Sequence, residues 1–269
     1  MRFCTLLLAY FIVNFGLFAQ NKIELVSLAE VDLKGLSQIA IDNRENVFVS
    51  DGSGGIYQFN SQGEQINHFS PSRQAQITHL DADRTVNIFA FSYDLQEISI
   101  FDRFLNPVVS KRFDSPIGLI KAATLGNNQA VWIFDESNLD LLKLDHRRMV
   151  VLQHQPLSLL LGEEALDIKE IREYQNLLFV RTNAKVFLFD NQGNYLKQYA
   201  YAGKDKMALY GSHLYYVING SLSQQDYRNG KVEELNLPVP ISGSAVQLQG
   251  GLLVFYNNIG FQIFKNPFR

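Results

Sequence analysis

The residues of this chain that could hold a ligand are carboxylates and amides that follow short apolar segments. They are Asp51, Asp135, Asn183, Asn219 and Asn257. Oxygen atoms of this kind suit a hard cation, so a Ca²⁺ site is one interpretation. Asp and Asn also suit tight turns, because they hydrogen-bond to nearby backbone and tolerate left-handed conformations. The turn interpretation is favoured, and we expect no bound metal ion and no other cofactor.

The sequence carries no recognisable catalytic pattern. Its histidines are His68, His79, His146, His154 and His213, and no two are spaced by two or four residues as in many zinc sites. A G-x-S-x-G nucleophile elbow is missing. The glycine-rich residues 50–55 precede no helical pattern, which indicates a hairpin turn and not a phosphate-binding loop. We therefore assign no catalytic residue, and a protein without enzymatic activity is favoured.

A hydrophobic pattern that recurs six times must position these residues. Each repeat has a dense apolar segment, a turn and a second apolar segment. The centres of the first segments are Phe48, Phe89, Trp132, Leu178, Tyr215 and Leu253, separated by 41, 43, 46, 37 and 38 residues. A period of about 40 residues with strand-type units is typical of a β-propeller. Strands covered on both faces lose polar alternation, as these segments do. We predict an all-β fold, a six-bladed β-propeller; a β-sandwich or two-domain β protein fits the regular period less well.

The two ends of the pattern predict how the ring closes. The last repeat has room for three strands, near residues 244–249, 251–257 and 260–264. Residues 23–31 form an apolar segment with no other blade to join. We expect this N-terminal strand to pair with the last blade, because closure removes sheet edges that would otherwise favour aggregation.

The first repeat resembles the NHL-type propeller repeat. Residues 35–64 contain the segments IAID, VFVSD and IYQF and the turn QGE, and residues 186–195 match the second half of the same pattern. The resemblance implies a six-bladed propeller. It implies no single activity, because propellers of this type include lactonases, lyases, receptor ectodomains and binding scaffolds.

The first 19 residues have the features of a cleaved secretory signal. Arg2 provides the charged start, residues 6–13 are apolar, and Ala19 is a small residue before a cleavage point at Gln20. A membrane anchor is the alternative, but the apolar stretch is shorter than the roughly 20 residues that a span needs. Cys4, the only cysteine, lies in this segment, so we expect no disulfide in the processed chain. Residues 20–269 would then form one periplasmic or extracellular propeller domain, with no transmembrane segment after cleavage.

The charge of the chain argues against a nucleic-acid partner. Its 24 Lys and Arg residues are outnumbered by 27 Asp and Glu residues, which gives a net charge of −3. Nucleic-acid binding depends on basic residues that gather on one face and neutralise phosphates. No nucleic-acid partner is expected.

One apolar connection between repeats predicts contact with a protein. Residues 154–162 include Leu157, Leu159, Leu160 and Leu161, and an exposed patch of this kind marks interaction sites. The alternative is a short helix or strand packed on its own blade. Tyr93 and Tyr201 fall near turns and are further candidates, because tyrosine is both apolar and hydrogen-bonding.

These observations favour a non-catalytic exported propeller. We expect it to bind protein partners in the cell envelope, as a scaffold or accessory subunit of an outer-membrane assembly. Two alternatives stay open. One is a lactonase- or lyase-like enzyme with a divalent cation on the propeller axis, and the other is a propeller that binds a small ligand or a glycan.

Overall fold

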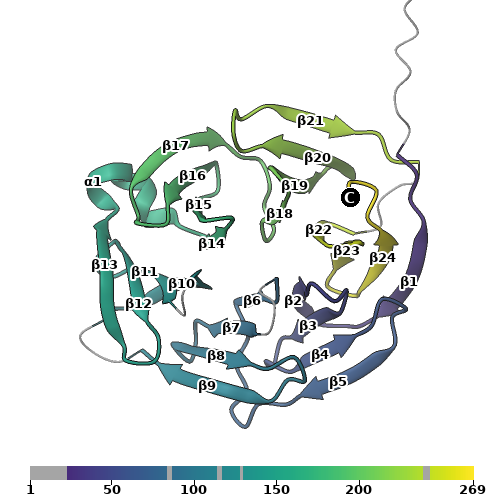
Figure 1. The fold of residues 1–269 in the computed structure, drawn as a ribbon, viewed down its shortest axis with the longest axis horizontal. Helices are drawn as coiled ribbons and strands as arrows, with labels where there is room; N and C mark the ends of the chain where they lie inside the picture. The colour runs from purple at the N-terminus through teal and green to yellow at the C-terminus, as the bar shows by residue number, and fades with distance from the viewer. Residues whose placement is uncertain (1–22, 84–86, 114–116, 128–129, 239–242) are drawn as a thin grey trace, which may run out of the picture.

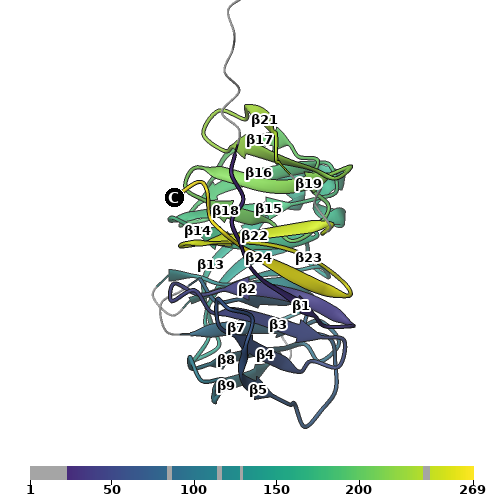
Figure 2. The same cartoon turned by 90° about the vertical axis from the view of Figure 1, so that its right-hand side faces the viewer.

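The chain folds into a closed ring of β-sheets. The computed structural model describes residues 23–83, 87–113, 117–127, 130–238 and 243–269. Within these ranges it contains six antiparallel sheets of four strands, arranged around a central axis (Figure 1). Seen from the side, the ring is flat compared with its width (Figure 2). The predicted six-bladed propeller is confirmed, whereas the predicted signal sequence lies outside the described residues.

Each blade runs outward from a strand near the axis. Blade 1 contains β2 (Leu36–Ile41), β3 (Val47–Asp51), β4 (Ile56–Phe59) and β5 (Gln65–Phe69). Blade 2 contains β6 (His79–Asp81), β7 (Ile88–Ser92), β8 (Glu97–Phe101) and β9 (Pro107–Arg112). Blade 3 contains β10 (Ile120–Leu125), β11 (Ala130–Asp135), β12 (Asp140–Asp145) and β13 (Val150–Pro156).

The second half of the ring repeats this order. Blade 4 contains β14 (Glu170–Tyr174), β15 (Leu177–Arg181), β16 (Lys185–Asp190) and β17 (Tyr195–Ala200). Blade 5 contains β18 (Ala208–Tyr210), β19 (His213–Ile218), β20 (Ser221–Asp226) and β21 (Val232–Leu235). Blade 6 contains β22 (Ala245–Gln249), β23 (Leu252–Asn257), β24 (Gly260–Lys265) and, as its outer strand, β1 (Ser27–Asp32).

The N-terminal strand completes the last blade, as the sequence predicts. In the antiparallel pairing of β1 with β24, Val31 lies opposite Phe261. The backbones approach closely here: a Cβ atom at Gly260 would lie 2.4 Å from the carbonyl oxygen of Val31. Glycine therefore allows the two end strands of the chain to meet.

Burial follows the position of a strand within its blade. All six residues of β11 are buried, whereas most residues of the outer strand β9 are exposed. The core lies between blades: Trp132 and Phe134 of blade 3 pack in one cluster with Leu178 and Phe187 of blade 4. Each fully buried side chain of this size contributes about 1.5–3 kcal/mol, so contacts between blades hold the ring together.

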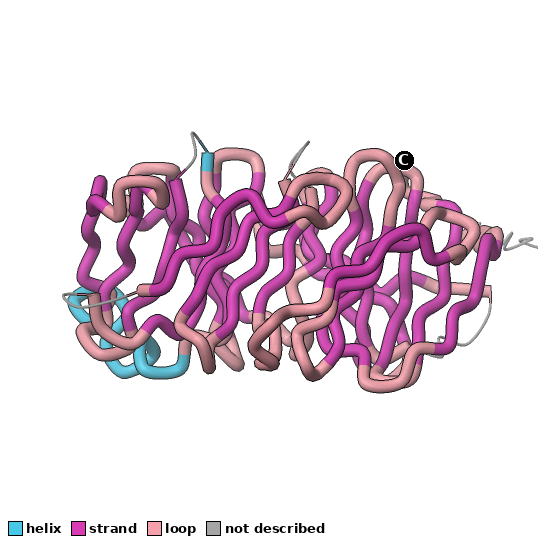
Figure 3. The backbone as a smooth tube through the Cα atoms, turned by 90° about the horizontal axis from the view of Figure 1, so that it is seen from below, coloured by secondary structure: helices cyan, strands magenta, loops and turns pink. Residues whose placement is uncertain are grey.

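An insertion interrupts the regular ring between blades 3 and 4. It consists of the helix α1 (Ser158–Leu161) and the 3₁₀ helix η2 (Gly162–Asp167). Figure 3 shows these helices at one end of the ring, beside the lower loops. The insertion explains the longest step, 46 residues, in the sequence repeat. None of the described helices is long and apolar enough to span a bilayer.

Candidate functional site

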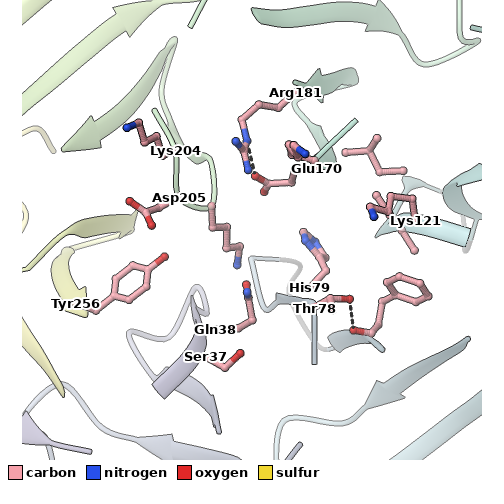
Figure 4. A pocket seen from close by; sticks show the side chains of 16 residues that line it. Ser37, Gln38, Thr78, His79, Lys121, Glu170, Arg181, Lys204, Asp205 and Tyr256 are labelled. Carbon is pink, nitrogen blue, oxygen red and sulfur yellow. Dashed lines mark hydrogen bonds and ion pairs between the residues drawn. The ribbon is translucent and has the colours of Figure 1, made fainter. Parts of the chain in front are cut away.

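A pocket opens on the propeller axis where the inner strands begin. Its volume is about 310 Å³. Polar residues line it from all six blades, because every inner strand starts at the same face of the ring. The polar side chains that Figure 4 labels are Ser37, Gln38, Thr78, His79, Lys121, Glu170, Arg181, Lys204, Asp205 and Tyr256.

Glu170 and Arg181 form the centre of one wall. They lie opposite each other on β14 and β15, so the antiparallel register brings their side chains together. The Nε atom of Arg181 donates to Oε2 of Glu170 at 3.3 Å, and both residues are buried (Figure 4). The same Oε2 atom accepts the backbone N–H of Met207 at 2.9 Å. Blade 4 is thereby fixed to the start of blade 5.

His79 contributes a neutral imidazole to the pocket. The residue is buried at the start of β6 and packs edge-on against Phe89. Burial, reinforced by the nearby Lys206 cation, lowers the pKa of His79 to about 4. The ring is therefore uncharged at neutral pH and can donate or accept one hydrogen bond at each nitrogen according to its tautomer.

Lys206 crosses the floor of the pocket. Its Nζ atom donates to the carbonyl oxygen of Ile39 at 2.9 Å and to that of Leu80. These carbonyls belong to β2 and β6, so one side chain joins blade 5 to blades 1 and 2. Burial and the neighbouring Arg172 cation lower the pKa of Lys206 to about 8.

Arg172 continues this polar network below the pocket. Its guanidinium lies 3.2 Å from Oδ2 of Asp83 and 3.6 Å from Oδ1 of Asp81, and it donates to the carbonyl of Met207 at 2.5 Å. Burial alone would raise the pKa of Asp81, but the cations of Arg172 and Lys206 hold it well below its usual value. Opposite charges thus stabilise one another across the axis, where an isolated buried charge would be strongly unfavourable.

The turn residues predicted to face the axis have a different role. Asp51 accepts the backbone N–H groups of Ser53 and Gly55 at 2.8 and 2.9 Å. Asp135 accepts the N–H of Gly118 at 3.0 Å and that of Ser137 at 2.9 Å.

The three predicted asparagines also belong to loops. Asn183 hydrogen-bonds to Asp167, Asn219 has φ of 51° in the turn between β19 and β20, and Asn257 accepts the N–H of Ile259 at 2.9 Å. Asn183 and Asn219 follow β15 and β19, and Asn257 ends β23, the second strands of their blades. Of the five candidates, none lines the axial pocket.

Side chains that could together ligate a metal ion do not gather in the part of the chain that the structure describes. Within the described ranges, no three His, Cys, Asp or Glu side chains are arranged to hold a metal. Oxygen-rich turns such as that of Asp51 direct their acceptor atoms at backbone N–H groups, which occupies the lone pairs a cation would use.

The leucines predicted to contact a partner separate into two groups. Leu157 is fully buried in the core between blades 3 and 4, and Leu161 is partly buried against the same cluster. Leu157 is therefore not available as a contact residue. Leu159 and Leu160 are 84% and 45% exposed, and Leu166 of η2, which the sequence did not single out, is 63% exposed. These three exposed leucines are called the leucine patch below.

The two predicted contact tyrosines also differ. Tyr201 is buried and packs edge-on against Tyr216 at a ring separation of 5.1 Å, so it is a core residue. Tyr93 is partly exposed, with the Lys121 ammonium 5.0 Å from its ring centre. Tyr93 therefore lies beside a residue of the axial pocket.

Comparisons with known proteins show the fold and no family. No family model matches the chain, and no curated protein matches it. The WD40 domain of Pan2 from Neurospora crassa is similar in structure, with a TM-score of 0.62 and 12% identity over 93% of this chain and 97% of that one. A streptogramin B lyase has a TM-score of 0.59 and 15% identity over 88% of this chain and 86% of its own. These similarities support the propeller and do not test the resemblance to the NHL-type repeat.

One sequence signal could have pointed to the axial site. Glu170 and Arg172 flank Ile171 directly before the strand core at Leu177–Arg181. Two charged residues two apart, in a strand whose place in the blade predicts burial, indicate a polar cluster. Their partners His79 and Lys206 carry no such local signal, because other blades supply them.

Proposed function

We propose that this chain is a non-catalytic propeller that binds a protein partner through the leucine patch. The observation that carries the proposal is the exposure of Leu159, Leu160 and Leu166 on a well-anchored element. Apolar side chains gathered on a surface are a common feature of protein interaction sites. A partner that covers them would remove apolar area from water and gain stability.

The anchoring of the insertion supports a docking role. The N–H of Leu157 donates to the carbonyl of Leu139 at 2.9 Å, and Ala165 is fully buried. Glu164 forms an ion pair with Lys185 at 2.5 Å. The leucine patch is therefore presented in a defined conformation, which lowers the entropy lost when a partner binds.

Photo-crosslinking tests this proposal at single-residue resolution. A photoreactive phenylalanine analogue replaces Leu159 in one variant and Val108, 62% exposed on β9 of blade 2, in the control. We expect a discrete crosslinked protein from position 159 only, and its loss when Leu166→Ser is added. Identical crosslinks from both positions, or none from position 159, would contradict the proposal.

The proposed setting is the cell envelope. The charged start, apolar stretch and small residue within residues 1–19 support export and cleavage before Gln20, and the propeller is proposed to be of the NHL type. Mass spectrometry of the protein from its native host should give an N-terminus at Gln20 in the periplasmic or extracellular fraction. An intact N-terminus in the cytoplasm would refute this part of the proposal.

An enzyme with an axial site is the second candidate. The overall similarity to a streptogramin B lyase and the presence of His79 and Glu170 in one pocket favour it over a fold with a featureless axis. The purified protein can be incubated with streptogramin B in the presence of Mg²⁺ or of a chelator. We expect no turnover in either condition; turnover that His79→Gln abolishes would establish the enzyme instead.

A further inference from the structure

The axial pocket holds a guanidinium whose donors are only partly used. Arg181 is 7% exposed, and its Nε atom is engaged by Glu170. Its two terminal nitrogens make no hydrogen bond to any residue that the structure describes. A planar guanidinium edge of this kind matches a carboxylate, which can accept two parallel hydrogen bonds from it.

Two further buried atoms in the same pocket lack a partner. The Oε1 atom of Glu170 and the Nε2 atom of His79 are shielded from solvent, and neither is hydrogen-bonded within the described part of the chain. Both residues line the pocket and lie around its middle in Figure 4. Glu170 as a carboxylate needs a donor, and His79 provides one further donor or acceptor. Buried polar groups of this kind are normally paired, so a bound molecule with hydroxyl groups would complete the site.

The charges around the opening favour an anion. Five cationic side chains line the pocket, namely Lys121, Lys169, Arg181, Lys204 and Lys206, against the carboxylates Glu170 and Asp205. Two of the lysines also pair with acids outside the pocket: Lys121 with Glu136 at 3.5 Å and Lys169 with Asp167 at 2.5 Å. These pairs are partly exposed and screened by salt, so the balance at the opening stays cationic.

The size of the pocket limits the ligand. A volume of about 310 Å³ is at the lower end of ligand sites, which span roughly 300–1,000 Å³. Lys206 and Arg172 join blades 1, 2, 4 and 5 by hydrogen bonds and ion pairs. The volume of the pocket suits a molecule of the size of one sugar ring.

We propose that the axial pocket binds a small hydroxylated carboxylate, of the class of sugar acids and hydroxy acids. The carboxylate accepts hydrogen bonds from the terminal nitrogens of Arg181. One hydroxyl donates to Oε1 of Glu170, and another pairs with Nε2 of His79. This site is separate from the leucine patch, so either proposal can fail without the other.

Isothermal titration calorimetry on the processed chain tests the ligand class directly. The probes are galacturonate and gluconate, with galactose as the neutral match and inorganic phosphate as a small anion without hydroxylated carbon. We expect binding of at least one of the two carboxylates and none of galactose at millimolar concentration. Failure of both carboxylates to bind overturns the proposal, and so does binding of phosphate alone, which would mark a simple anion site.

Variants of the pocket distinguish recognition from general charge attraction. Arg181→Gln should weaken carboxylate binding by about tenfold or more, and Arg181→Lys should restore only part of it, because lysine lacks the planar pair of donors. Lys204→Gln, at the exposed opening, should have a smaller effect that disappears at high salt. Lys231→Gln, at an exposed lysine outside the pocket, is the matched control and should leave binding unchanged.

A second variant tests hydroxyl recognition and leaves every cation of the pocket in place. Glu170→Gln keeps the shape of the side chain and replaces one acceptor by a donor, so hydroxyl recognition should weaken while phosphate binding does not appear. Melting curves of each variant show whether the ring is intact. Carboxylate binding that folded Arg181→Gln and Glu170→Gln proteins retain in full would overturn the assignment of the site.

Discussion

Two regions of this propeller depart from the usual rule that charged side chains are exposed and apolar side chains are buried. The axis buries charged side chains, and the insertion exposes apolar ones. At the axis, Arg172, Asp81 and Glu170 are charged and buried. On the insertion, Leu159 and Leu166 are apolar and exposed. The buried charges are matched by ion pairs within the chain, whereas no described residue covers the two leucines. The comparison shows that a departure from ordinary burial can be a structural device when the chain compensates it, and suggests a docking surface when it does not.

The largest loss of stability is expected when the ion pairs of the buried Arg172 at the axis are removed. Arg172→Met removes the cation beside Asp81 and leaves this buried carboxylate without its arginine partner, which costs about 3–5 kcal/mol of unfolding free energy. Urea denaturation at neutral pH measures the change. Arg147→Met alters an exposed arginine and should change stability by less than about 0.5 kcal/mol.

The acid response of the same variant sharpens this result. In the intact protein the folded-state pKa of Asp81 is lowered, so its stabilising contribution is present above the unfolded value and is lost only as pH falls through the lower folded value. In Arg172→Met the folded pKa of Asp81 rises, so acid unfolding should begin at a higher pH. An unchanged acid midpoint would show that Arg172 does not hold the carboxylate ionised.

The next effect compares Leu157, which directly precedes α1, with Leu159 inside the helix. Leu157→Ala leaves a cavity in the core between blades 3 and 4 and should lower the unfolding free energy by about 3 kcal/mol. Leu159→Ala, two residues along the chain, removes a side chain that is 84% exposed. It should leave stability within about 0.5 kcal/mol of the intact protein. Equal losses from both variants would mean that the whole insertion is core.

A moderate effect is expected from the pH dependence of Lys206. Its folded pKa of about 8 lies below the usual lysine value, so between pH 8 and about 10 the unfolded chain binds more protons than the folded chain. Stability contributed by this group must rise with pH in that window, by about 2 kcal/mol if one pKa unit corresponds to about 1.4 kcal/mol. The measurement is the unfolding free energy of the intact protein minus that of Lys206→Met. This quantity should be larger at pH 9.5 than at pH 7.5.

The smallest expected change in stability comes from the leucine patch itself. The double variant Leu159→Ser with Leu166→Ser should melt at the temperature of the intact protein, because neither side chain is buried. It should bind less of an environment-sensitive hydrophobic dye. A melting temperature that drops by several degrees would mean that these leucines stabilise the fold, as the buried charges at the axis do.

The ring could be predicted from the sequence because the apolar pattern of each strand reflects how deeply the strand is buried. Residues 130–135 form an unbroken apolar segment up to Asp135, and every one of them is buried in β11. The closing strand was predictable from what the last repeat lacked, and β1 fills that place. The first inference relies on a pattern within a few residues, and the second relies on counting the strands of each repeat along the whole chain.

The site was harder to predict because the ring assembles it from distant segments. Glu170, Arg181 and His79 meet only after blades 2 and 4 take their places, and no spacing in the sequence encodes that distance. Runs of similar residues cause a second difficulty. Leu157 and Leu159 have the same chemistry and lie two positions apart, yet Leu157, at the N-cap of α1, is buried and Leu159, within the helix, is exposed.

The pairing of β1 with β24 brings the first and the last described strands of the chain side by side. The N–H of Lys265 donates to the carbonyl of Val26 at 2.9 Å, so the two extremities of the described chain are immediate neighbours. In space the blades form a cycle without a first or a last member. A circular permutant of the described residues, with Ile23 and Arg269 joined by a linker and new ends opened in an exposed loop, would keep every strand pairing of the ring. The axial pocket and the leucine patch would then be preserved in a protein whose chain begins in a different blade.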